Sequence, residues 1–201
     1  MARKPNGRCN EIHRHCAALL EWWNESSKEQ RERGAQWYKD AYAEIDNAAI
    51  HCFTNTERAV KAAAVLSQRK SWKHSIDALW KLCWYVSAEG RELPSVGLNS
   101  VTDKAVACLR GENALSGPKV EAFAAAILGD KSAAVVDVWM LRAMGWNKNH
   151  SPDPGGMYDD LAMALKLAAY CVRVPITDFQ ATVWLAIREN WRSNGRAKSR
   201  T

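Results

Sequence analysis

Apolar residues recur every three to four positions along most of this chain, and that spacing predicts a series of amphipathic α-helices. Helical periodicity places such residues on one side of each helix, where they can be buried together. We therefore expect an all-α fold. A stretch rich in glycine, proline and asparagine at residues 145–156 predicts a mobile surface loop. Helices are expected at residues 9–23, about 27–50, 59–68, 76–84, 101–110, 161–172 and 179–191.

Capping residues mark where several of these helices begin. Ser26 or Ser27 is expected to open the second helix, since a serine hydroxyl can accept a hydrogen bond from a free backbone N–H. The run Thr54-Asn-Thr-Glu57 has the spacing of a capping box and predicts another start. Thr177 and Asp178 are expected to cap the last helix.

The run Ser116-Gly117-Pro118 predicts a further helix start, and this one has a lysine in its first turn. Proline is tolerated there because its missing N–H would have no helical partner. Free N–H groups and the positive end of the helix dipole favour phosphate, with Ser116 and Gly117 at the contact. Lys119 lies within that turn, where a positive charge is disfavoured. It is either a phosphate contact, an amine that loses its proton readily, or an ordinary solvated lysine.

A carboxylate opens the next predicted helix. Asp137 lies 18 positions after Lys119, and apolar residues flank it on both sides, so we expect it at the edge of buried surface. Taken alone, such an aspartate is most simply a helix cap, and such a lysine is most simply solvated. Together they form a candidate catalytic pair.

Length and charge narrow the class of protein. The 201 residues, 47% of them hydrophobic, suffice for one domain or for two small lobes packed together. The net charge is +6, of which four charges lie in the last ten residues, which leaves +2 for the rest. A basic end on a mildly basic body suits a polyanionic partner. We expect no membrane contact and a cytoplasmic location, because the sequence has neither a secretory signal nor a long apolar run.

The cysteines do not predict a metal site. They lack a repeated Cys-x-x-Cys spacing, so we expect reduced and mostly buried thiols. One arguable metal-binding constellation is formed by Cys9, His13, His15 and Cys16, but an exposed helix with mixed polar residues explains these four better. We therefore expect no metal. The six cysteines are Cys9, Cys16, Cys52, Cys83, Cys108 and Cys171.

Two segments together resemble the helix-hairpin-helix DNA glycosylase superfamily, the endonuclease III-like enzymes. That family has a hairpin ending in Gly-x-Lys, then an aspartate in a Val-Asp-x-x-x-x-Arg context that opens the next helix. Gly117-Pro-Lys119 and the run from Val136 to Arg142 match, and so does the spacing. Leu115 stands where the family's hairpin usually has its first glycine. The resemblance spans about residues 53–191, and the shortened interval before Lys119 is typical of a compact, phage-encoded member.

This resemblance implies a two-lobed helix-hairpin-helix glycosylase-like fold and an enzyme that flips a base out of duplex DNA and cleaves its N-glycosidic bond. Lys119 and Asp137 would be catalytic: the carboxylate stabilises positive charge on the sugar, and the amine can form a Schiff base that gives AP-lyase activity. Many relatives carry a four-cysteine iron–sulfur loop near the C-terminus. Nothing after Cys171 could build one, so we expect no cluster and no other cofactor.

A third segment also resembles this family, in a part that binds DNA. Ala64-Val-Leu-Ser-Gln68 is similar to the family's Leu-Ser-x-Gln segment, whose glutamine enters the duplex where the target base has left it. The resemblance makes Gln68 the wedge, and Arg69 and Lys70 phosphate contacts. Lys73 lies in the same predicted basic turn, before the next helix. A solvated basic turn is the simpler alternative.

We expect N-terminal helices at residues 1–52, the glycosylase-like core at 53–191 and a basic C-terminal tail at 192–201. The partner would be double-stranded DNA, in repair or modification, and the protein would act as a monomer in the cytoplasm, that of the host if phage-encoded. Two other functions stay open. One is a phage base-modifying transferase on the same scaffold, and the other is a non-catalytic DNA-binding protein.

Overall fold

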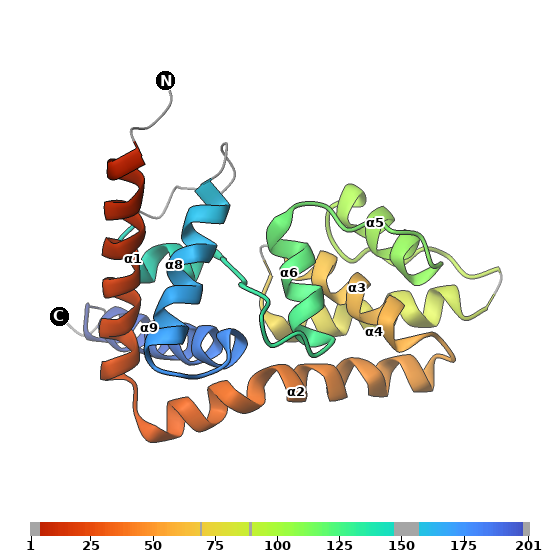
Figure 1. Cartoon of the computed structure of the whole chain (residues 1–201). Helices are drawn as coiled ribbons and strands as arrows, with labels where there is room; N and C mark the ends of the chain where they lie inside the picture. The colour runs from red at the N-terminus through yellow and green to blue at the C-terminus, as the bar shows by residue number, and fades with distance from the viewer. Residues whose placement is uncertain (1–4, 69, 89, 147–156, 199–201) are drawn as a thin grey trace. The chain divides into compact units, whose positions relative to one another are not determined.

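The computed structural model describes residues 5–68, 70–88, 90–146 and 157–198 (Figure 1). All regular secondary structure in these ranges is helical, which confirms the predicted all-α class. Most of the irregular stretch at 145–156 lies outside the described residues. The helices are α1 (Pro5–Glu25), α2 (Lys28–His51), α3 (Thr56–Leu66), α4 (Trp72–Val86), α5 (Asn99–Leu109), α6 (Pro118–Ile127), α7 (Val138–Ala143), α8 (Met157–Cys171) and α9 (Ile176–Lys198).

The capping predictions had mixed outcomes. Ser27 opens α2 as expected: its backbone N–H donates to Oε1 of Gln30, and its hydroxyl accepts from the Gln30 N–H. The expected capping box before α3 is wrong, because Asn55 is the cap and its side chain accepts from the backbone N–H of Arg58. Glu57 instead pairs with Lys61 one turn later, at 2.7 Å.

The last helix is longer than its pattern suggested. We expected it to begin after Thr177 and Asp178, but α9 already begins at Ile176, directly after Pro175. Its first turn closes on the proline carbonyl, which accepts from the N–H of Phe179 at 3.0 Å. The helix continues to Lys198, so residues 192–198 of the expected basic tail are helical.

The chain divides into two compact units. Unit 1 comprises residues 1–38 and 130–201, and unit 2 comprises residues 39–129. This division falls within α2 and after α6, whereas the sequence suggested a boundary near residue 52. The first part of the chain and its last third therefore share one unit, although more than 90 residues separate them.

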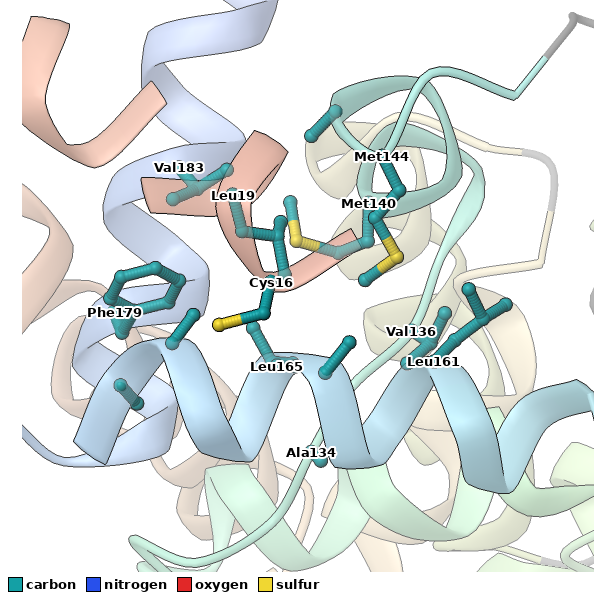
Figure 2. Packing of buried hydrophobic residues seen from close by; sticks show 14 of the residues in the cluster. Cys16, Leu19, Ala134, Val136, Met140, Met144, Leu161, Leu165, Phe179 and Val183 are labelled. Atoms are coloured by element: carbon teal, nitrogen blue, oxygen red, sulfur yellow. The ribbon is translucent and has the colours of Figure 1, made fainter. Parts of the chain in front are cut away.

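The core of unit 1 is formed by α1, α7, α8 and α9 (Figure 2). α8 packs against α1 and α9, and α7 packs against α9. Leu19, Met140, Leu165 and Phe179 are fully buried at their centre. The ring of Trp23 stacks on Phe179 with centroids 5.1 Å apart. This burial follows the helical spacing of the apolar residues in the sequence.

Unit 2 is organised around α3, which packs against α4, α5 and α6. Seven of its eleven residues are buried. Alanines at positions 59 and 62–64 leave room for the neighbouring helices to approach closely, while Val60, Val65 and Leu66 fill the space between them. None of the described helices in either unit is both long and apolar enough to cross a membrane.

Candidate functional site

The predicted start of α6 is confirmed. Gly117 is its N-cap with φ of +88°, a conformation that glycine adopts without strain, and Pro118 takes the first helical position. No side-chain hydrogen bond caps this helix start. A Cβ built on Gly117 would meet no described atom within 4 Å. An anion could therefore approach this glycine closely.

Lys119 lies in the first turn of α6, and the fold gives it a partner that is distant in sequence. Its Nζ donates a hydrogen bond to the hydroxyl of Ser67 at 3.1 Å, across 52 positions of chain. Ser67 is the C-cap of α3, and its hydroxyl donates in turn to the carbonyl of Ala64 at 2.7 Å. The ammonium also lies 5.2 Å from the ring centroid of Phe123. A serine and an aromatic ring thus hold a half-buried lysine at this helix start.

Gln68 follows Ser67 directly, so the candidate wedge and the candidate nucleophile are neighbours in unit 2. Its side chain is half-buried and makes no hydrogen bond to any described residue. Trp72 begins α4 four residues later, and its ring meets Phe123 edge to face at 6.1 Å. The end of α3, the start of α4 and the start of α6 therefore converge around Lys119.

The basic residues beside Gln68 have different surroundings. Arg69 lies outside the described residues. The ammonium of Lys70 donates to the backbone carbonyl of Val96 and so holds the loop before α5. Lys73 lies in the first turn of α4 and not in the preceding loop, because Ser71 caps that helix; its side chain is exposed. Lys73 is therefore more accessible to a phosphate than Lys70.

Ser116 is exposed and accepts a hydrogen bond from Nζ of Lys104 at 2.9 Å. It therefore does not cap α6, a role that Gly117 takes. The pair places a second cation beside the helix start, contributed by α5. Such a cation adds to the positive potential that the N–H groups of α6 already present.

Asp137 belongs to unit 1 and is the N-cap of α7. Its Oδ1 accepts from the backbone N–H groups of Trp139 and Met140, both at 2.9 Å. The segment before it is held by Tyr158 of α8, whose hydroxyl donates to the carbonyl of Ala134 at 2.9 Å and accepts from the N–H of Val136 at 3.3 Å. The capping role is therefore observed, and the carboxylate has a fixed position within its unit.

A buried polar pair lies within electrostatic range of Asp137. The phenol of Tyr38 on α2 donates to Oε1 of Gln180 on α9 at 2.7 Å, and both side chains are buried. Burial raises the pKa of Tyr38 well above its usual range, and the negative charge of Asp137 raises that pKa further. Tyr38 therefore stays protonated and can keep donating to Gln180.

The sequence did not identify two of these residues as functional. Ser67 stood inside the quoted Leu-Ser-x-Gln segment without a role, because a partner 52 positions away leaves no local pattern. Nothing in the sequence marks Tyr38 as more than one aromatic residue of a long helix. One signal for Ser67 was present: the basic turn that begins with Arg69 and Lys70 indicates that the helix before it ends near Ser67, where side chains can reach a neighbouring element. Lys119 and Asp137 themselves lie in different units.

The four candidate metal-binding residues of α1 are not gathered into one site, and His15 and Cys16 are buried, not exposed as expected. Sγ of Cys9 contacts Nδ1 of exposed His13 at 3.6 Å. His15 is buried, and its Nδ1 donates to the carbonyl of Met144 at 3.2 Å. Within the described ranges, no group of three or more histidine, cysteine, aspartate or glutamate side chains is arranged to hold a metal. All six cysteines are free thiols, and four of them are buried.

Comparison with known proteins gives a family but not an activity. No curated protein matches the chain, and no solved structure matches it. One family model matches residues 4–191 and therefore nearly all of the chain. The chain thus belongs to the family of unknown function DUF7178.

Proposed function

We propose that this protein is a DNA base-excision enzyme that flips a base from the duplex and cleaves its N-glycosidic bond, with Lys119 as the amine nucleophile. The observation that carries this proposal is the hydrogen bond from Lys119 to Ser67, directly beside Gln68. It places a half-buried amine, an uncapped helix start and an amide side chain without a described hydrogen-bond partner in one unit.

The surroundings of Lys119 support DNA docking. An uncapped helix start with an open glycine can receive a phosphate on its N–H groups. Lys104 and Lys73 supply positive charge on the neighbouring helices. Gln68 can fill the space that an extruded base leaves in the stack, and an extruded base costs a few kcal/mol of stacking that such a contact offsets.

The chemistry requires an amine that can lose its proton. In the proposed reaction, neutral Nζ of Lys119 attacks C1′ of the deoxyribose, the N-glycosidic bond breaks, and the base leaves with the bonding electron pair and takes up a proton. The attached nitrogen then gives up a proton and its lone pair forms the C1′=N bond of a Schiff base, while the C1′–O4′ bond breaks and O4′ takes the electron pair and a proton. Ser67 holds the amine in place between turnovers. The proposal gives Asp137 the role of the carboxylate that stabilises positive charge on the sugar.

The test is incubation with duplexes that carry damaged, mismatched, hypermodified or abasic sites, followed by borohydride reduction. Wild type should release a base from at least one duplex and give a reduced covalent adduct with DNA. Lys119→Gln should lose the adduct. The matched control is Lys81→Gln, which removes an exposed lysine of α4 in the same unit, and this variant should keep the adduct.

Each result separates one function from the others. Base release without an adduct would show that water is the nucleophile and would overturn the role of Lys119. Tight duplex binding with neither release nor adduct would overturn the glycosylase proposal and favour the DNA-binding protein. Transfer of a group to a base in the intact duplex would favour the base-modifying transferase. Duplex DNA as partner, the monomeric state and the cytoplasmic location stay predictions.

A further inference from the structure

Two arginines and three tryptophans interleave in unit 1, where α7 packs against α9. The guanidinium of Arg142 lies 4.3 Å from the ring centroid of Trp139 and 5.2 Å from that of Trp191. The guanidinium of Arg188 lies 4.1 Å from the centroid of Trp184 and 5.9 Å from that of Trp139. We call these five residues the Arg–Trp stack.

The helical repeat builds this stack. Trp184, Arg188 and Trp191 are four and then three positions apart, so they share one face of α9. Trp139 and Arg142 are three apart on α7 and lie on one face of that helix. The rings of Trp139 and Trp191 meet edge to face at 6.2 Å and join the two helices.

The stack is not sealed into the core. Trp191 is 44% exposed, and Arg142, Trp139, Trp184 and Arg188 are only half-buried. Within the part of the chain that the structure describes, Arg142 has no carboxylate partner, and its buried Nε has no hydrogen-bond partner. Rings therefore hold the guanidinium of Arg142, and its positive charge is available to an anion.

The sequence at the end of α9 is rich in positive charge. Glu189 lies on the same helix, but its carboxylate pairs with Arg33 at 2.8 Å and accepts from Gln30 at 2.7 Å, both on α2. The sequence after Glu189 contains no acidic residue, whereas Arg192, Arg196 and Lys198 follow within α9. Partly exposed aromatic rings interleaved with arginines are the combination that binds unpaired bases and their phosphates together.

We propose that the Arg–Trp stack binds single-stranded nucleic acid, with a base stacked against Trp191 and phosphates paired with Arg142 and Arg188. This site is separate from the residues around Lys119 and does not depend on the proposed reaction. It would give the protein affinity for unpaired strands, such as those beside a lesion or in a displaced strand.

The test uses the full chain and fluorescence anisotropy with two labelled probes of equal length and phosphate count. One is an oligothymidylate, and the other is an oligomer of tetrahydrofuran abasic sites, which lack the C1′ aldehyde that an amine could trap as a Schiff base. Wild type should bind the oligothymidylate more tightly. Trp191→Ala should weaken that binding about tenfold, within the range for loss of one stacked base, and should leave the abasic probe nearly unaffected. Trp84→Ala is the matched control and should bind the oligothymidylate as wild type does. Trp84 is also exposed, at 59%, and the guanidinium of Arg91 lies 3.5 Å from its ring centroid, but this pair lies in unit 2.

Several outcomes would overturn the proposal. Equal affinity for both probes would show that no base stacks on the protein. Unchanged binding by a folded Trp191→Ala variant would show that no base stacks on Trp191. Binding of polyglutamate as tight as that of the oligothymidylate would point to an acidic peptide instead. If circular dichroism shows that Trp191→Ala is unfolded, Arg142→Lys replaces it. Lysine keeps the charge but cannot lie flat against the Trp191 ring and hold it for a base, so this variant should also reduce the preference for bases.

Two further arms sharpen the result. An oligouridylate of the same length distinguishes RNA from DNA, and tighter binding of either single strand than of the abasic probe supports the site. Lys119→Gln should bind the oligothymidylate as wild type does. A Lys119→Gln variant that loses both the borohydride adduct and this affinity would overturn the separate site, whereas loss of the adduct alone leaves it supported.

Discussion

Gly34 of α2 lies against the backbone of Thr182 of α9 within unit 1. A Cβ at Gly34 would be 2.7 Å from the backbone nitrogen of Thr182 and 2.8 Å from its Cα. Real Cβ atoms essentially never approach other atoms so closely. The two helices therefore meet at a point that only glycine permits.

Gly34→Ala should destabilise the protein by about 2–3 kcal/mol, because the added methyl group meets backbone atoms that cannot rotate away. The same substitution at an open helix position would stabilise by about 1 kcal/mol, so the sign of the effect is itself informative. Chemical denaturation measures it. Asn47→Ala, at an exposed position of α2, is the control. A more stable Gly34→Ala variant would contradict the observed packing.

Asp137→Asn should leave stability nearly unchanged, because asparagine caps helices about as well as aspartate and can accept the same two N–H groups. Base release should nevertheless fall by at least about a hundredfold, since the negative charge is lost. Thermal melts and single-turnover assays measure the two effects. Asp130→Asn removes the charge of an exposed aspartate in the same unit and should keep activity. A folded, fully active Asp137→Asn variant would reduce Asp137 to a helix cap.

Gln68→Ala should weaken binding to a duplex with an abasic or extruded site and leave single-strand binding nearly unchanged, because a wedge matters only where a stack is interrupted. Competition binding on the two substrates measures the difference. Gln36→Ala, an exposed glutamine of unit 1, should bind both as wild type does. Equal losses on duplex and single strand would make Gln68 a general contact or a packing residue.

His15 should make the protein less stable in mild acid. Burial lowers the pKa of this histidine from its ordinary value of 6.5, and nearby Arg14 lowers it further, while the hydrogen bond to Met144 and the charge of Glu11 act in the opposite direction. Above pH 6.5 both folded and unfolded chains hold His15 neutral. As the pH falls below 6.5, the unfolded chain takes up the proton first, and folding stability declines.

His15→Asn tests this pH dependence, because asparagine can still donate to the carbonyl of Met144 but does not titrate. Denaturation curves at several pH values between about 7.5 and 5 give the free energy of unfolding, which should decline less with falling pH in this variant than in wild type. His13→Asn, at an exposed position of α1, should retain the full decline. An unchanged pH profile in His15→Asn would show that other groups cause the acid sensitivity.

The sequence alone was sufficient to predict the fold class and several helix starts. Ser27, Gly117 with Pro118, and Asp137 begin helices where the sequence indicated, because caps and apolar periodicity act within a few residues of chain. The same kind of reasoning was wrong for α3, where the N-cap is Asn55 and not Thr54.

Only the tertiary structure decided which side chains meet. Three contacts join residues that are dozens of positions apart. Lys119 donates a hydrogen bond to Ser67, Lys70 donates to the carbonyl of Val96, and the guanidinium of Arg142 lies against the ring of Trp191. No sequence spacing encodes such a pairing, because it depends on how several buried helix faces pack together at once. A helix start is fixed by its own neighbours along the chain, whereas the partner of a lysine is fixed by the packing of the elements around it.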